Sequence, residues 1–170
     1  QNLSELPLPR LALGTIAGAG LAMAGAMFQA LFRNPLASPY TLGISSGASL
    51  GAAAVILLTG GGVWYGVPLV SLAAFGGALG CVLVVYGVAH MSRGATMATL
   101  LLTGITIGFI CSALIVLVLY LANQYDLGAI LRWMMGSLEV VGMDPAYEAM
   151  ALFVLAGGVV VPMNVLLKRR

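Results

Sequence analysis

Charged residues are scarce in this 170-residue chain. Only 7% of its residues are Asp, Glu, Lys or Arg, against about 25% in an ordinary soluble domain. Hydrophobic residues make up 61% of the sequence, and one globular core of this length cannot bury so much apolar surface. The excess must therefore face lipid, which excludes an ordinary soluble domain and predicts an integral membrane protein. We expect membrane lipid as a partner and no nucleic acid.

Cysteine and histidine are also rare, with two cysteines and one histidine in the chain. Cys81 and Cys111 both lie in the middle of apolar runs, far in sequence from any Cys or His cluster. This placement favours two buried small hydrophobic residues over a disulfide or a metal site. We therefore expect no metal and no cofactor bound by this chain.

Five segments are apolar and long enough to cross a bilayer, which needs about 20 residues. They are far longer than barrel strands and lack strict alternation, so helices are the only structure that satisfies their backbone groups in lipid. The sequence predicts one all-α domain over 1–170, a polytopic bundle of transmembrane helices. A more polar segment, 129–138, is predicted as a short helix at the outer surface. The predicted spans are 11–32, 40–58, 67–91, 97–121 and 146–167.

The charges fall unevenly between the two sides that these spans define. One side receives only basic residues, namely Arg33, Arg93, Lys168, Arg169 and Arg170. Because a basic excess marks the cytoplasmic side, the chain is predicted to start outside the membrane and to end in the cytoplasm. The opening residues do not resemble a cleavable signal peptide. An outside start would then require an earlier span, so we expect the chain to be a fragment of a longer protein.

Small residues recur at intervals of four within three of the spans. This spacing lets helix backbones approach closely in lipid, although some of these residues could instead line a path that bulky side chains would obstruct. The sequence leaves both interpretations open. The residues concerned are Gly14, Gly18 and Ala22, then Gly76 and Gly80, then Gly104, Gly108 and Ser112.

The stretch RNPLASPYTLGISSGASLG, from Arg33 to Gly51, interrupts the apolar pattern. Its Asn-Pro and Ser-Pro pairs break a helix, because proline lacks an amide donor and restricts the residue before it. Freed backbone groups and hydroxyls in a membrane need protein or water as partners. Either a capped turn without a transport role or the wall of a water-filled cavity fits this pattern. Gln29, just before the break, is expected to hydrogen-bond the turn.

The segment LPRLALGTIAGAGLAMAGAMFQALFRNPLASPYTLGISSGASLGA resembles the signature of one family of membrane permeases. These are the permease subunits of ABC importers for iron–siderophore complexes, haem and vitamin B12. LLLTGITIG (100–108) and RWMMGSLEVVG (132–142) also fit this family, in the right order and spacing. The resemblance extends over essentially the whole chain and would place it at about helices two to six of a ten-helix subunit.

The resemblance implies a transport role without an enzymatic step in this chain. Such a permease pairs with a second permease subunit, as a homo- or heterodimer, in the inner membrane of a bacterium or archaeon. Two cytosolic ATPase subunits would use ATP, and an extracytoplasmic solute-binding protein would deliver the ligand. The sequence does not distinguish between an iron–siderophore complex, haem and vitamin B12.

The resemblance also assigns roles to particular residues. Asn34 and Leu36 would form a cytoplasmic gate with Met97 and Ala98, although the family often carries hydroxyls at the last two positions. Trp133 and Met134 would close an outer gate, and an interfacial belt role fits Trp133 equally well. Arg10 would dock acids of the binding protein, or alternatively meet lipid phosphate.

Two other classes of membrane protein compete with the permease. An ion-coupled carrier generally needs buried ionisable groups, and the predicted spans contain no Asp, Glu, Lys or Arg in their interiors. A membrane-embedded enzyme would need catalytic Asp, His or Cys groups at bilayer depth, where only the two cysteines are present. Both are kept as alternatives.

Overall fold

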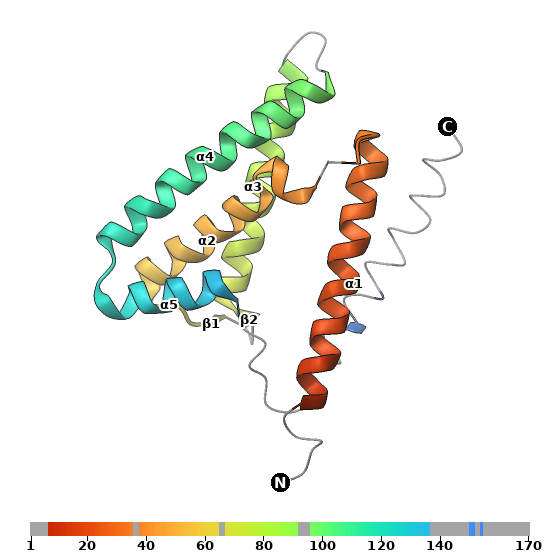
Figure 1. The fold of residues 1–170 in the computed structure, drawn as a ribbon. Helices are drawn as coiled ribbons and strands as arrows, with labels where there is room; N and C mark the ends of the chain where they lie inside the picture. The colour runs from red at the N-terminus through yellow and green to blue at the C-terminus, as the bar shows by residue number, and fades with distance from the viewer. Residues whose placement is uncertain are drawn as a thin grey trace. The chain divides into compact units, whose positions relative to one another are not determined.

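A computed structural model of the chain describes residues 7–35, 38–64, 67–91, 96–136, 150–151 and 154. Almost all of these residues are helical, which confirms the predicted all-α class. The chain divides into two compact units, Gln1–Ala37 with Ser137–Arg170 and Ser38–Gly136, and each is described by itself. The elements are α1 (Pro7–Phe32), η1 (Pro39–Leu42), α2 (Ile44–Thr59), β1 (Val63–Trp64), β2 (Val67–Pro68), α3 (Leu69–Met91), α4 (Met97–Leu121) and α5 (Gln124–Met135) (Figure 1).

Helix α1 is the main described element of the first unit, and its 26 residues correspond to about 39 Å at 1.5 Å per residue. This length exceeds the roughly 30 Å of a bilayer's hydrocarbon core. The structure has a helix over the predicted span 11–32, and it starts four residues earlier because prolines are tolerated in a first helical turn. Of the predicted span 146–167, only 150–151 and 154 are described, and they are helical. The remainder of that span lies outside the described residues.

The end of α1 is closed by hydrogen bonds to the turn that follows it. Arg33 adopts a left-handed conformation, with φ of 48°, and the Asn34 N–H donates to the Gln29 carbonyl oxygen at 3.2 Å. This is the bond that defines a Schellman motif. The Gln29 side chain also donates through Nε2 to the Pro35 carbonyl oxygen at 2.9 Å. The expectation that Gln29 would hydrogen-bond the broken turn is therefore confirmed.

Arg33 occupies a position that favours glycine, so we predict that Arg33→Gly stabilises the protein. A left-handed conformation costs a residue with a Cβ about 1 kcal/mol, and glycine avoids this cost. The gain would be measured as a higher unfolding midpoint of the purified full-length protein in detergent. Arg33→Ala, which removes the charge but keeps the Cβ, should not show this gain. Equal stabilisation by both variants would contradict the backbone explanation.

The second unit begins with a break that the sequence did not place correctly. The prediction of one continuous helix over 40–58 is wrong, because the 3₁₀ helix η1 ends at Leu42 and the next residue, Gly43, is left-handed with φ of 72°. Helix α2 starts only after this glycine and has 16 residues, about 24 Å at 1.5 Å per residue. It is too short to cross a membrane as an isolated straight helix. The Pro39 ring and the left-handed glycine together explain the break.

Helices α3 and α4 match their predicted ranges closely. With 23 and 25 residues, they and α1 are the three helices in the described part of the chain that are long and apolar enough to span a membrane. Residues 67 and 68, predicted to open the third span, instead pair with Trp64 and Val63 in a two-stranded antiparallel hairpin. Strands of two residues are too short for an alternating pattern to reveal them.

Helices α2 and α3 pack backbone against backbone through glycines. A Cβ placed on Gly47 would lie 2.6 Å from the carbonyl oxygen of Gly77, and one on Gly51 would meet the carbonyl oxygen of Ala73. Close approach of this kind is what small residues permit in membranes. In contrast, a Cβ on Gly76 or Gly80 would meet nothing within 4 Å among the described residues. The close contact on α3 in the described part of the chain is made by Gly77, whereas Gly80 lines a cavity between the helices.

Helix α5 lies across one end of the second unit (Figure 1). Its Ile130, 1% exposed, packs with Ala53 and Ile56 of α2. The helix begins at Gln124, five residues before the predicted start of the 129–138 segment, and ends at Met135. The earlier start is set by Asn123, whose Oδ1 accepts hydrogen bonds from the N–H groups of Tyr125 at 3.0 Å and Asp126 at 2.9 Å.

Removal of this cap is predicted to destabilise α5. Asn123→Ala should cost about 1 kcal/mol, because two amide groups at the helix start lose their acceptor. Asn123 also donates to Asp126 Oδ2 at 2.7 Å, and Asn123→Ser keeps a side-chain oxygen that can accept the bonds at the helix start. We expect a lower unfolding midpoint for the alanine variant and a much smaller change for serine. An alanine variant as stable as the parent protein would contradict the capping role.

Candidate functional site

The break between η1 and α2 lies directly on the backbone of α4. A Cβ on Gly43 would be 2.9 Å from the Gly104 carbonyl oxygen and 3.0 Å from the Gly108 nitrogen. Conversely, a Cβ on Gly104 would be 2.7 Å from Leu42 Cα and 2.8 Å from the Thr41 carbonyl oxygen. Larger residues would not fit on either side. Gly104 and Gly108 thus allow the polar break to pack closely against the middle of α4.

The depth of this contact follows from the helix geometry. Gly104 is seven residues after Met97, the first residue of α4, which places it about 10 Å along the helix axis. The break is therefore level with the interior of α4 rather than with its end. Irregular backbone at such depth is tolerated only where protein encloses it or water reaches it.

Local hydrogen bonds satisfy several of the backbone N–H and carbonyl groups at the break. Thr41 Oγ1 donates to the Ser38 carbonyl oxygen at 2.6 Å, and the Thr41 N–H donates to the same oxygen at 3.1 Å. The Gly43 N–H donates to the Tyr40 carbonyl oxygen at 3.1 Å, and the Gly47 N–H donates to the Gly43 carbonyl oxygen at 2.9 Å. The break is thus a defined turn with a fixed shape.

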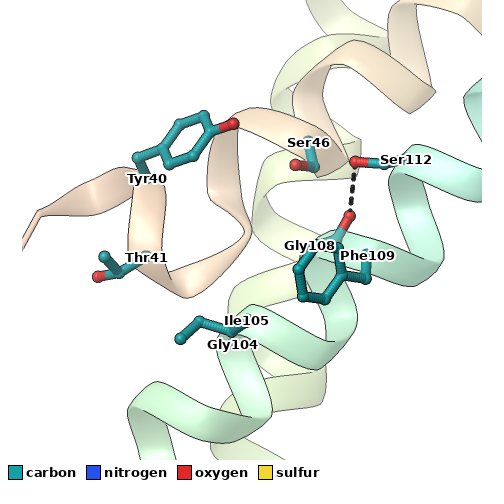
Figure 2. A pocket seen from close by; sticks show the side chains of 8 residues that line it. All are labelled: Tyr40, Thr41, Ser46, Gly104, Ile105, Gly108, Phe109 and Ser112. Atoms are coloured by element: carbon teal, nitrogen blue, oxygen red, sulfur yellow. Dashed lines mark hydrogen bonds between the residues drawn. The ribbon is translucent and has the colours of Figure 1, made fainter.

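A pocket of about 210 Å³ opens between η1, the start of α2 and the middle of α4. Figure 2 shows the hydroxyl groups of the three segments around it, with Ser112 Oγ donating to the Gly108 carbonyl oxygen at 2.9 Å. Its described lining combines hydroxyls, glycines and apolar groups without a charged side chain. Such a wall offers hydrogen bonds but no strong ionic contact. The lining residues are Tyr40, Thr41, Ser46, Gly104, Ile105, Gly108, Phe109 and Ser112.

The sequence indicated part of this pocket and missed the rest. The four-residue spacing of Gly104, Gly108 and Ser112 left packing and path-lining both open, and the structure shows the three residues along the pocket. Gly104 also makes the close backbone contact. Tyr40 and Phe109 were missed, because nothing in an apolar run separates an aromatic residue that lines a cavity from one that faces lipid.

The predicted inner gate falls on both units. Asn34 follows α1 in the first unit and is half-buried, and Leu36 lies outside the described residues. Met97, 46% exposed, and Ala98 form the first turn of α4 in the second unit. Thr96 caps this turn, with Oγ1 accepting from the Thr99 N–H at 3.3 Å. The pairing of the two segments in a gate stays a prediction.

The predicted outer residues lie on two helices. Trp133 and Met134 are in the last turn of α5, with 37% and 42% of their surface exposed. Arg10 is exposed in the first turns of α1. Their proposed roles in gating and docking stay predictions.

The two cysteines, far apart in the sequence, lie next to each other in the structure. Cys81 of α3 and Cys111 of α4 bring their Sγ atoms to 3.6 Å from each other. Both are buried and are free thiols, as expected. The contact was missed because it depends on how two helices thirty residues apart pack together.

The architecture and the pocket define a class of protein. The turn that ends at Gly43 and the hydroxyl-lined pocket both lie against α4, one of the helices long and apolar enough to span a membrane. Helices of this length and hydropathy are those of a polytopic membrane protein. The sequence model of the FecCD transport family matches residues 1–166. The chain belongs to this family, which confirms the resemblance drawn from its motifs.

Individual relatives support the same assignment. The chain is 40% identical over 148 residues to the vitamin B12 import system permease protein BtuC of Salmonella paratyphi A (strain ATCC 9150 / SARB42), which covers 87% of this chain and 44% of that protein. The same values hold for the BtuC protein of Salmonella typhi. The chain thus spans less than half the length of these curated relatives.

A solved structure shares the fold. It is described as an inward-facing conformation of an ABC transporter of the metal-chelate type, and it superposes with a TM-score of 0.79 at 26% sequence identity. The match covers 96% of this chain and 50% of that one.

Proposed function

We propose that this chain is part of the permease subunit of an ATP-driven importer for a bulky metal chelate. The ligand would be an iron–siderophore complex, haem or vitamin B12. Family membership and the named relatives support this assignment. The chain itself would carry out no covalent chemistry, and ATP would be used by two partner ATPase subunits.

The observation that carries the proposal is the polar break seated against α4. An importer needs two packings of the same helices, one open to each side of the membrane. The contact between Gly43 and Gly104 brings a turn with fixed hydrogen bonds onto a helix with the hydroxyl-lined pocket beside it. A small rotation of α4 against this turn would widen or close the pocket. Because the pocket lining carries no charged side chain, its contacts with a large ligand would be weak. Weak contacts allow the ligand to pass without being trapped.

The remaining parts of the system follow from the family. A second permease subunit would complete the path, and an extracytoplasmic binding protein would deliver the ligand near Arg10. Asn34 and Leu36 would face the cytoplasm near the ATPase subunits. The basic residue excess on that side supports this orientation, with the chain start outside the cell membrane.

Transport by the reconstituted full-length system tests this function. Proteoliposomes containing the permease, its ATPase and its binding protein should accumulate ligand only when ATP is supplied. An ATPase variant unable to hydrolyse ATP is the matched control. Accumulation that continues without ATP and follows an imposed proton or sodium gradient would support the ion-coupled carrier instead.

The ligand would be identified by testing a panel of candidate compounds in the same uptake assay. Because the named relatives at 40% identity import vitamin B12, we place the corrinoid first, ahead of haem and of an iron–siderophore complex. Uptake should be high for one of the three and low for the others. Saturable, ATP-dependent uptake of a chelate outside these three classes would refute the ligand assignment while leaving the importer intact.

A further inference from the structure

A short β-hairpin connects α2 to α3 at one end of the second unit. Its strands β1 and β2 lie at the same end of the unit as α5 (Figure 1), and β2 is followed directly by Leu69, the first residue of α3. The 23 residues of α3 extend about 35 Å at 1.5 Å per residue, slightly more than the roughly 30 Å of a bilayer's hydrocarbon core. The hairpin therefore lies at the level where α3 meets the surface of the membrane.

Apolar side chains are exposed on both faces of this hairpin. Val63 pairs with Pro68, and Trp64 pairs with Val67. Val63 and Val67 therefore point to opposite faces, because cross-strand partners share a face and neighbours along a strand alternate. Val63 is nevertheless 67% exposed and Val67 43% exposed, and Leu58 in the last turn of α2 is 79% exposed. Neither face of the hairpin is thus packed into the core of the described part of this unit.

The composition of the hairpin does not suit exposure to water. An antiparallel sheet with one face in water alternates apolar with polar side chains, and a hairpin of only two strands is at best marginally stable in water. The sequence contains no Asp, Glu, Lys or Arg over 34–92, whereas α5 at the same end of the unit carries Asp126 and Arg132. Tryptophan, the second residue of β1, is of a type enriched at membrane–water interfaces. An apolar environment therefore fits the hairpin better than water does.

Several backbone groups beside the hairpin are already hydrogen-bonded. The Gly60 N–H donates to the Ile56 carbonyl oxygen at 2.8 Å, and the Leu69 N–H donates to the Gly62 carbonyl oxygen at 2.9 Å. Pro68 has no N–H that would need a partner. Because unsatisfied backbone groups are costly away from water, these features lower the cost of placing the hairpin in the membrane surface.

We propose that the β1–β2 hairpin inserts into the surface of the phospholipid bilayer, at the boundary between the headgroups and the acyl chains. Val63, Val67 and Leu58 would contact acyl chains there. The inserted hairpin would hold the adjoining ends of α2 and α3 at a fixed depth in the membrane. This inference requires that α3 spans the membrane, and it does not depend on which ligand the protein transports.

Spin labels on the full-length protein in phospholipid liposomes measure this depth. The native cysteines would be replaced by alanine, and one label would be attached at Val63→Cys or at Val67→Cys. Collision rates of each label would be measured with oxygen, which concentrates among acyl chains, and with a water-soluble nickel chelate. Both labels should give an oxygen-to-nickel ratio at least as high as that of a lipid labelled on its headgroup. Gln124→Cys, at the exposed first residue of α5, is the matched control and should give a lower ratio.

Two results would overturn the proposal. Labels at 63 and 67 as accessible to the nickel chelate as the label at 124 would place the hairpin in water, where its valines could serve only a protein partner. Low collision rates with both reagents would show that the hairpin is packed against protein. The measurement needs neither ATP nor ligand, so a failure of ATP-dependent uptake would refute the proposed function and leave this result intact.

Discussion

Gly104→Ala is expected to destabilise the protein and to abolish most of its uptake. The added methyl group would meet the backbone of the facing turn, at 2.7 Å from Leu42 Cα and 2.8 Å from the Thr41 carbonyl oxygen. Backbone atoms cannot move aside as a flexible side chain can. Overpacking of this kind costs about 1–3 kcal/mol, and we expect a value near the upper end. The unfolding midpoint in detergent and ATP-dependent uptake would both be measured.

The chain offers a matched control for this substitution. Gly76 lies in α3 of the same unit, and a Cβ there would meet nothing within 4 Å in the described part of the chain. Gly76→Ala should leave uptake unchanged and could raise helix stability by up to about 1 kcal/mol. Similar losses in the two variants would show that any alanine in these helices is harmful, and would contradict the specific role of the Gly104 contact.

Filling the hydroxyl-lined pocket is expected to block transport without unfolding the protein. Ser112→Trp would place an indole in a space of about 210 Å³, next to Tyr40 and Phe109. We expect uptake to fall at least about 10-fold, which corresponds to an added barrier of only about 1.4 kcal/mol. The unfolding midpoint should change much less than in Gly104→Ala, because Ser112 is exposed to the open pocket.

Thr106→Trp is the control for this experiment. Thr106 is exposed on the same helix and, like Ser112, donates its hydroxyl to the carbonyl oxygen four residues earlier, at 2.9 Å. It does not line the pocket. Its replacement should retain uptake, and an equal loss in both variants would mean that bulk anywhere on α4 is harmful.

Most of the fold was predictable from the sequence because very few backbone structures satisfy their hydrogen bonds in lipid. Long apolar segments can only be helices in a membrane, so the ends of α1, α3 and α4 were predicted to within four residues. The error at α2 has a local cause. The mean hydropathy of a window that includes Pro39 to Gly43 is that of a continuous apolar helix. A single left-handed glycine, Gly43, nevertheless divides this segment into two helices.

The functional site was predictable only in part. Broken backbone at Asn34–Pro39 indicated a polar feature, and the family motif directed attention to the same stretch. The later break, at Thr41–Gly43, and its contact with α4 could not be inferred, because that contact depends on how η1 and α4 pack. The Cys81–Cys111 contact is a similar case, since residues thirty apart give no local signal of proximity. Gly77 and Gly76 differ only in which face of α3 they occupy, and neighbouring helices decide which one is used.

We propose that the polar break lines an aqueous path, rather than facing lipid or being sealed by protein. Water access to Ser46, which lines the pocket, tests this most directly. Ser46→Cys would be placed in the full-length transporter with Cys81 and Cys111 replaced by alanine, and treated with a charged, membrane-impermeant thiol reagent. Val116→Cys, at a residue of α4 that is 66% exposed and outside both cavities, is the lipid-facing control. Rapid modification of Cys at 46 that stops uptake, at a rate that changes when ATP is added, is the predicted result. A thiol at 46 that stays as unreactive as the one at 116 in every ATP state would contradict the account.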